Sequence, residues 1–253
     1  MSEYLVVLPI MAALTHIAGY ILYNVQAKLG SSEPNPVSWF LWAFLATLNG
    51  PTFTAMNDPI SALQFLAGSV GYIATFLYVL FIGKFRWPKP MEWGMFAVGI
   101  FVALVWKVSD PGIANMVLAI AIAWSFIPTI IGVWRDPRKE KATPWWFWTT
   151  AFTMTAVYIV ATKGWWTPSL IMPVLLLLCH AVVPFLASKH RTQVWIARKE
   201  EELKSQERWC AYLKASYLSS LRNQLWFYAE EDRKRFEPAR AECVRLRKLL
   251  GMW

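Results

Sequence analysis

The sequence predicts an all-α polytopic membrane protein with seven transmembrane helices in a 3+1+3 parallel repeat, followed by a C-terminal cytosolic helical extension. Three observations support this prediction. The chain is 57% hydrophobic and only 16% charged, whereas soluble domains carry about a quarter charged residues. Seven apolar segments approach or reach the roughly 17–25 residues that a transmembrane helix needs. Finally, a tryptophan motif occurs twice, with its two copies 106 residues apart.

The apolar segments are expected to be helices in chain order, and their boundaries follow the charged and Gly/Pro-containing stretches between them. They cover about 4–26, 37–56, 59–83, 91–108, 112–134, 144–162 and 168–187. The first should be a retained helix, because residues 1–4 lack the basic stretch of a secretory signal. The second runs into Asn49-Gly50-Pro51, which should break or kink it.

Charge divides the chain into two domains. Residues 1–188 hold ten Lys/Arg and seven Asp/Glu, and residues 189–253 hold fifteen and nine. If the N-terminus lies outside, only Lys107 and Lys163 fall in outside loops. The inside loops then carry Lys28, Lys84, Arg86, Lys89, Arg135, Arg138, Lys139 and Lys141. The positive-inside rule therefore predicts a cytoplasmic C-terminus, in an inner or plasma membrane.

The repeated motif defines the internal duplication. The first copy, 36–44, places Trp39 and Trp42 near the start of an apolar segment, and the second copy, 144–152, places Trp145 and Trp148 in the same way. Repeat 1 is expected over about 4–83, a linker helix over 91–108 and repeat 2 over 112–187. Because each repeat has three helices, the single linker helix restores the orientation, and the two repeats enter the membrane in parallel.

The tail, 189–253, is expected to be helical, because apolar residues recur every three or four positions from Trp209 to Tyr228. Glu237-Pro238 should break it, and a second short helix should follow. Three interpretations remain open for this basic amphipathic tail: a hairpin packing on itself or on an identical subunit, a helix lying on anionic lipid, and a surface for a cytosolic partner. Nucleic acid is not the expected partner.

The 3+1+3 arrangement with an outside N-terminus resembles that of the SWEET and PQ-loop transporters, over about residues 4–187. Ile127-Pro128-Thr129 is similar to a PQ-loop signature, with Thr129 in place of the glutamine, whereas the first half has no matching proline. The paired W-x-x-W motifs are closest to those of PnuC-type vitamin transporters, in which this motif lies at the substrate site. The resemblance also implies hinge roles for Pro128, Pro173 and Pro184.

The tryptophans of the repeat are the first candidates for a substrate site. Residues three apart share a helix face, so each repeat can present a pair to one central axis, where flat aromatic faces suit sugar, nicotinamide or nucleobase rings. Trp42 and Trp148 lie deeper than Trp39 and Trp145, and for all four the alternative is an interface anchor.

Other polar and aromatic residues of the apolar segments complete the candidate set. His180 lies in the middle of an apolar segment, where an ionisable side chain indicates a functional role. The position in repeat 1 that corresponds to His180 falls near Tyr72, so Tyr72 is expected to face the same cavity. Asn49 precedes the Gly-Pro break, and its alternative role is a helix–helix hydrogen bond. Trp124 and Tyr158 are plausible cavity liners whose alternative is core packing.

These residues favour a transporter of a small neutral ring-bearing solute, such as a vitamin, nucleoside or sugar, working by alternating access. Within the seven segments Glu92 is the only Asp or Glu, which favours facilitated diffusion. The alternative is an oligomeric membrane effector or pore-forming protein, regulated through its tail. An enzyme is not expected, because the chain has no catalytic or phosphate-binding motif, and its cysteine and histidine spacing predicts neither a metal nor a cofactor.

Overall fold

The computed structural model describes residues 2–82, 87–88, 90–222 and 226–252 of the chain. Throughout this described part every regular element is a helix. The chain divides into two compact units, Met1–Ser188 and Lys189–Trp253.

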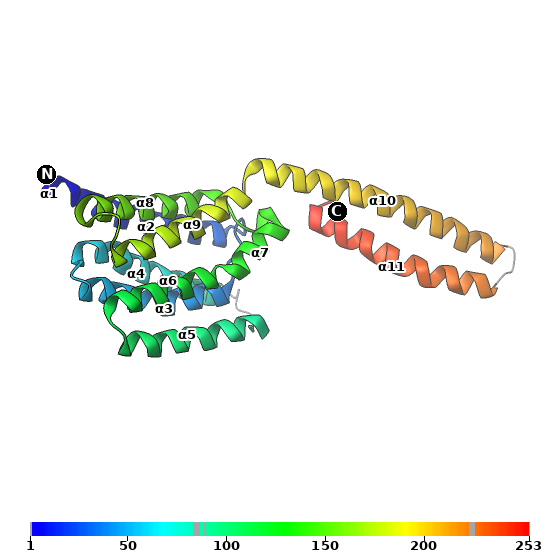
Figure 1. The fold of residues 1–253 in the computed structure, drawn as a ribbon. Coiled ribbons are helices and arrows are strands. Elements are labelled where there is room, and N and C mark those ends of the chain that lie inside the picture. Colours follow the sequence, from blue (N-terminus) through cyan, green and yellow to red (C-terminus); the bar gives the residue numbers. More distant parts are fainter. Residues whose placement is uncertain (1, 83–86, 89, 223–225, 253) are drawn as a thin grey trace. The chain divides into compact units, whose positions relative to one another are not determined.

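The helices of the first unit follow the predicted apolar segments closely, with the fifth segment divided in two. In chain order they are α1 (Ser2–Leu5), α2 (Val7–Lys28), α3 (Pro36–Ala55), α4 (Pro59–Phe81), α5 (Pro90–Val108), α6 (Pro111–Ser125), α7 (Ile127–Arg135), the 3₁₀ turn η1 (Pro137–Lys139), α8 (Ala142–Lys163), the 3₁₀ turn η2 (Pro168–Leu170) and α9 (Ile171–Leu186) (Figure 1).

Three of these helices begin with the same two-residue device, a capping side chain followed by proline. Asn35, Asp58 and Asp110 each accept hydrogen bonds from backbone N–H groups of the first turn, at the starts of α3, α4 and α6. The proline that follows each cap has no N–H to leave unpaired and has a helical φ already set. The helix starts are therefore encoded locally, in the sequence of the connections.

Four segments of the described chain are long and apolar enough to cross a membrane: Val7–Lys28, Pro59–Phe81, Pro111–Arg135 and Pro168–Leu186. Their outer faces carry exposed apolar side chains, such as Ile17 and Ile21 on α2 and Val70 and Leu77 on α4. Exposed apolar surface on this scale is typical of contact with lipid. The helices α3 and α8 are similar in length but richer in Trp and Thr, which lowers their hydropathy.

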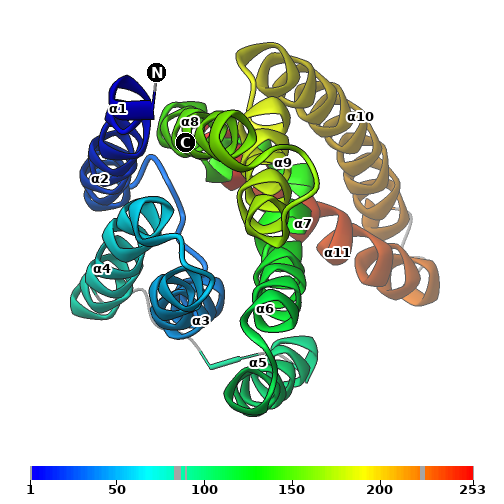
Figure 2. The same cartoon turned by 60° about the vertical axis from the view of Figure 1, so that its left-hand side comes forward.

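The helices of the first unit pack in two groups. The helix α4 contacts both α2 and α3, and α9 contacts both α6 and α8. Between the groups α2 packs on α8, and α3 packs on α6. Figure 2 shows α4 beside α2 and α3, and α9 beside α8 and α6, with α5 outside α3 and α6. The main hydrophobic core lies where the two groups meet.

Prolines divide one apolar segment but not another. The helix α3 continues through Pro51, so the expected break at Asn49-Gly50-Pro51 does not interrupt it. The hydroxyls of Thr52 and Thr54 donate to the carbonyls of Leu48 and Gly50. The backbone next to the proline therefore has additional hydrogen bonds, although Pro51 has no N–H to donate to the Thr47 carbonyl.

In contrast, the fifth segment is divided at Phe126, and α7 starts just before Pro128. Pro173 lies in the first turn of α9, where proline costs no hydrogen bond. Pro184 lies inside the last turn of the same helix. Of the three predicted hinges, only Pro128 therefore coincides with an interruption of a helix.

The second unit is a helical hairpin in which α10 (Lys189–Arg222) packs on α11 (Trp226–Leu250). Leu203, Cys243 and Leu246 form its small core, and Glu207 pairs with Arg247 between the two helices. The predicted break at Glu237-Pro238 is wrong, because α11 continues through Pro238. This proline is exposed, so water can reach the carbonyl that it leaves without a partner.

Candidate functional site

The four tryptophans of the repeated motif form a closed ring in the core of the first unit. Ring centroids lie 5.1 Å apart for Trp39–Trp42 and for Trp145–Trp148, 6.3 Å for Trp42–Trp145 and 6.0 Å for Trp39–Trp148. Each side chain is 1% exposed, and the planes meet at steep angles in the edge-to-face arrangement that aromatic pairs favour. All four side chains are therefore enclosed by other residues of the first unit.

Further aromatic residues surround this ring, and we call the whole set the aromatic cluster. The Trp148 and Tyr20 ring centroids lie 5.1 Å apart and those of Trp42 and Phe126 lie 4.7 Å apart, with tilted planes in both pairs. Two positions in α2 and α4 lack a side chain where the cluster needs space: a Cβ at Gly19 would meet the Trp148 indole at 2.5 Å, and one at Gly71 would overlap the Tyr20 ring. The full cluster consists of His16, Tyr20, Tyr23, Trp39, Trp42, Tyr72, Phe126, Trp145, Trp148, Phe152 and His180.

The indole N–H groups of the four tryptophans have different partners. Trp39 donates to the Tyr23 hydroxyl at 3.3 Å, Trp145 to the Glu140 carboxylate at 3.3 Å and Trp148 to the His16 carbonyl at 3.2 Å. The N–H of Trp42 has no hydrogen-bond partner in the described part of the chain. A buried unpaired donor costs about 1–3 kcal/mol, so Trp42 offers a donor that a bound solute could satisfy.

Two buried histidines flank Phe152 from opposite helix groups. His16 on α2 contacts the Phe152 ring at 5.1 Å, and His180 on α9 contacts it at 4.9 Å. The side chains of Tyr20 and Gln64 bond the two ring nitrogens of His16 at 3.1 and 3.3 Å, whereas His180 Nδ1 bonds the Leu176 carbonyl at 2.7 Å. The His180 imidazole is therefore bonded to the backbone of its own helix, and it packs against other rings of the aromatic cluster.

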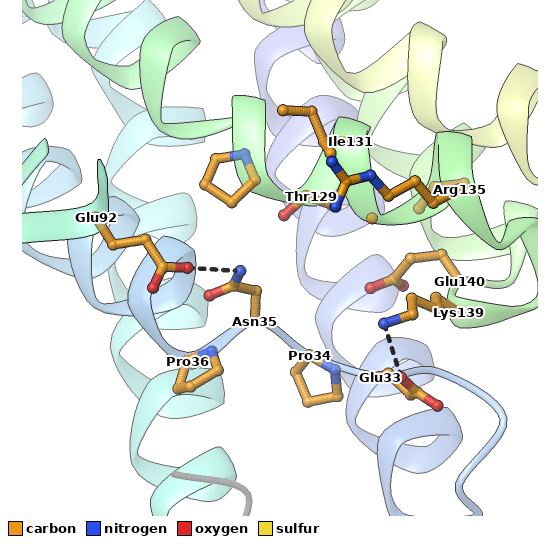
Figure 3. Close-up of a pocket in the computed structure, with 13 residues that line it drawn as sticks. Glu33, Pro34, Asn35, Pro36, Glu92, Thr129, Ile131, Arg135, Lys139 and Glu140 are labelled. Atoms are coloured by element: carbon orange, nitrogen blue, oxygen red, sulfur yellow. Dashed lines mark hydrogen bonds and ion pairs between the residues drawn. The ribbon is translucent and has the colours of Figure 1, made fainter. Parts of the chain in front are cut away.

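A pocket of about 560 Å³ opens at one end of the helix bundle, directly beside the aromatic cluster. Its walls come from the segment before α3, the start of α5, α7 and the connection into α8. Figure 3 shows Glu92 hydrogen-bonded to Asn35 on one side and Lys139 paired with Glu33 on another. Arg135 and Lys139 line the pocket together with the carboxyl groups of Glu33, Glu92 and Glu140, and Lys28, Arg138 and Lys141 belong to the same predicted inside loops. Lys84, Arg86 and Lys89 of the predicted inside loops lie outside the described residues.

Glu140 connects the pocket to the aromatic cluster. It lines the pocket but is only 3% exposed, and its carboxylate accepts from the Tyr23 hydroxyl at 2.9 Å and from the Trp145 indole. Burial raises the pKa of this carboxyl to about 8, against the opposing effect of its hydrogen-bond donors. The sequence-based search for a buried carboxylate considered only the apolar segments, and this one comes from the connection between them.

The remaining predicted site residues occupy different places. Tyr72 contacts Trp42 at 6.0 Å and belongs to the cluster. Trp124 does not, because its side chain is 54% exposed on the outer surface of α6. Tyr158 is buried in the core on α8 but contacts no ring of the cluster, and Asn49 is buried on α3 with its side-chain oxygen unpaired among the described residues.

The sequence-based reasoning missed His16, Tyr20, Tyr23 and Glu140. One signal was present: Tyr20 and Tyr23 have the same three-residue spacing as each tryptophan pair, in the helix preceding the first pair. Across the described residues no group of three His, Cys, Asp or Glu side chains could hold a metal ion. The site can therefore offer aromatic faces, one free indole N–H, a buried carboxyl and hydroxyl groups.

Comparison with known proteins gives no relative for this chain: no protein-family model, no curated protein and no solved structure matches it.

Proposed function

We propose that this chain is an integral membrane transporter that moves a small neutral ring-bearing solute, such as a vitamin, nucleoside or sugar, by alternating access and facilitated diffusion. The observation that carries the proposal is the closed ring of four tryptophans, two from each copy of the repeated motif, buried where the two helix groups meet. The flat faces of indole rings suit a flat solute ring.

The packing order of the helices supports a seven-helix 3+1+3 arrangement. In each group the third helix lies between the first and the second, since α4 contacts α2 and α3 while α9 contacts α6 and α8. Interchanging the two groups maps α2, α3 and α4 onto α6, α8 and α9. The contact between α2 and α8 then becomes the contact between α6 and α3, so the contacts between the groups follow the same symmetry. Tyr20 contacts Trp148 and Phe126 contacts Trp42, and Tyr20 and Phe126 are 106 residues apart, as Trp42 and Trp148 are.

The pocket supports a route from one membrane face to the cluster. It opens among the connections that carry Arg135, Arg138 and Lys139, which the positive-inside rule assigns to the cytoplasm. Glu140 of its wall contacts Trp145, and Thr129 contacts Ser38, on the two motif-bearing helices. Because the cluster is tightly packed, a solute would enter it only when the helix groups separate. The structure is then a closed state of the transport cycle.

The experiment is a thermal-stability screen of the purified protein against B vitamins, nucleosides, sugars and amino acids. A ligand at a hundred times its dissociation constant adds about 2.7 kcal/mol. Stabilisation by one class, lost in Trp148→Ala, supports the proposal. The control is Trp146→Ala, two residues away on the same helix but with a side chain that is 50% exposed, and it should respond like the wild type. A flat screen, or equal loss in both variants, would contradict the proposal.

A second candidate function is an oligomeric membrane effector that acts through its tail. The observation in its favour is an exposed, stacked aromatic pair on α10, Trp209 and Tyr212, whose ring centroids lie 5.4 Å apart. Exposed aromatic residues of this kind are common in contacts with partners or membrane interfaces. The repeated tryptophan ring has no role in this alternative, which is why we rank it second.

A further inference from the structure

A continuous hydrogen-bonded chain joins the two helix groups at the pocket end of the bundle. Trp39 on α3 donates to the Tyr23 hydroxyl on α2, Tyr23 donates to the Glu140 carboxyl, and Trp145 on α8 donates to the other oxygen of Glu140. The link between Tyr23 and Glu140 crosses from the first group to the second. These contacts tie both tryptophan motifs to one carboxyl group.

The surroundings of Glu140 contain charges of both signs, but they are engaged elsewhere. Lys139, its neighbour in η1, pairs with Glu33 at 3.5 Å. Arg138 pairs with Asp136, and Glu92 of α5 accepts from Asn35. Arg135 of α7 also lines the pocket. Within the described residues no ion pair to Glu140 is found; its hydrogen-bond partners are the hydroxyl of Tyr23, the indole of Trp145 and the side chain of Ser32.

We propose that Glu140 is a proton-controlled latch: its carboxyl is protonated while the two helix groups are closed over the pocket, and it releases the proton to pocket water when they separate. This inference rests on the proposed function, because a transporter must open and close the pocket end of the bundle during its cycle. It does not depend on which solute is carried.

The direction of the pH effect follows from the environments of the two states. Burial holds the pKa of Glu140 at about 8 in the closed state, whereas a hydrated glutamate has a pKa of about 4.3. The closed state therefore binds the proton more tightly. Its stabilisation is complete at low pH and is lost as the pH rises through about 8. Between about pH 5 and 7.5 the closed-to-open ratio should fall about tenfold per pH unit.

Other groups facing Glu140 modify this titration but do not replace it. The charge of Glu33 raises the pKa of Glu140. Its removal should therefore move the midpoint of the pH transition to a lower pH and leave the steepness of the transition unchanged. Tyr23 contributes a hydroxyl that stabilises both the ionised carboxylate and the contact between the helix groups. The two residues therefore provide variants with distinct expected effects.

The experiment measures a distance across the pocket end at several pH values, with no solute present. Spin labels are placed at Leu29→Cys and Thr143→Cys, two exposed positions flanking the link, in the full chain with Cys179, Cys210 and Cys243 replaced by alanine. The protein is reconstituted in lipid nanodiscs. Pulsed dipolar spectroscopy then reports the populations of short and long distances. We expect the long-distance population, relative to the short one, to rise at least tenfold from pH 6 to pH 8.

The variants decide the assignment. Glu140→Gln, which cannot lose a proton, should abolish the pH dependence, while Glu33→Gln should keep it with a lower midpoint. Tyr23→Phe should increase the long-distance population at every pH, and it serves if Glu140→Gln does not fold. A wild-type distribution that is unchanged with pH, or a pH response that survives in Glu140→Gln, would overturn the latch. Because no solute is used, this result is independent of the ligand screen, and either proposal can fail alone.

Discussion

Replacing Trp42 and Trp148 by phenylalanine should separate stability from solute binding. Both substitutions shrink a fully buried side chain of the aromatic cluster, and we expect a packing loss on the order of 1 kcal/mol from each. The two residues differ in their N–H groups. Trp148 donates to the His16 carbonyl, whereas the Trp42 N–H is unpaired within the described residues.

The hydrogen-bond terms therefore have opposite signs. Trp148→Phe loses a bond with a net value of about 1 kcal/mol, while Trp42→Phe removes a buried unpaired donor that costs about 1–3 kcal/mol. We expect Trp148→Phe to lower the free energy of unfolding by about 2 kcal/mol. Taking about 1 kcal/mol, the lower end of the range, for the unpaired donor, we expect Trp42→Phe to leave the free energy of unfolding almost unchanged. For a unit of this size the difference corresponds to about 4–8 °C in the midpoint of thermal unfolding.

The assay is thermal unfolding of each variant in the same detergent, with and without the solute found in the screen. If the unpaired N–H of Trp42 is the donor that the solute takes, Trp42→Phe should keep its stability but lose most of the ligand-induced shift. Equal destabilisation by the two substitutions would refute the reasoning, since it would mean that the indole N–H groups have no differential role.

Three further predictions test other parts of the structure. Gly71→Ala should lower the unfolding midpoint by several degrees, because its Cβ would overlap the Tyr20 ring and overpacking costs about 1–3 kcal/mol; Gly94→Ala, where a Cβ meets nothing within 4 Å, is the control in the same thermal assay. Asp58→Asn keeps the cap of α4 but loses the 2.9 Å ion pair with Lys163, so stability should fall by on the order of 1 kcal/mol, and unchanged unfolding would contradict a role for the pair. Truncation after Ser188 should leave solute binding intact and, if the effector alternative is correct, should instead abolish oligomers seen by light scattering.

The positions of the helices could be predicted from the sequence because their signals are local. Long apolar runs and Asn-Pro or Asp-Pro starts coincide with α3, α4 and α6. The errors concern proline. Pro51 was expected to break a helix, but neighbouring threonine hydroxyls bond the backbone around it. Pro238 was also expected to break one, but it lies on an exposed face of α11. Whether proline ends a helix depends on partners that its own sequence position does not reveal.

The site could be predicted where a repeated motif marked it and, for His180, where an ionisable residue stood inside an apolar segment. The spacing of Trp39, Trp42, Trp145 and Trp148 appears twice in the sequence, and the structure brings all four together. Glu140 belongs to no repeated pattern in the sequence. It stands in a run of charged residues that predicts a solvated loop, and its burial arises from Tyr23 and Trp145, which belong to two other helices. Tertiary contacts of this kind leave no periodic pattern in a single sequence.

The same contrast explains why the candidate site has two different parts. In the aromatic cluster the packing energy is spread over many contacts. Separating the helix groups there costs free energy, and no single group in the cluster controls that separation. The link through Glu140 depends on one ionisable group at the edge of a pocket that water can enter. A change of one proton can therefore alter the balance at the pocket end while the packing of the cluster stays the same. In a protein that must open and close, we expect control to lie in Glu140 and Tyr23, and solute recognition to lie in the tryptophans behind them.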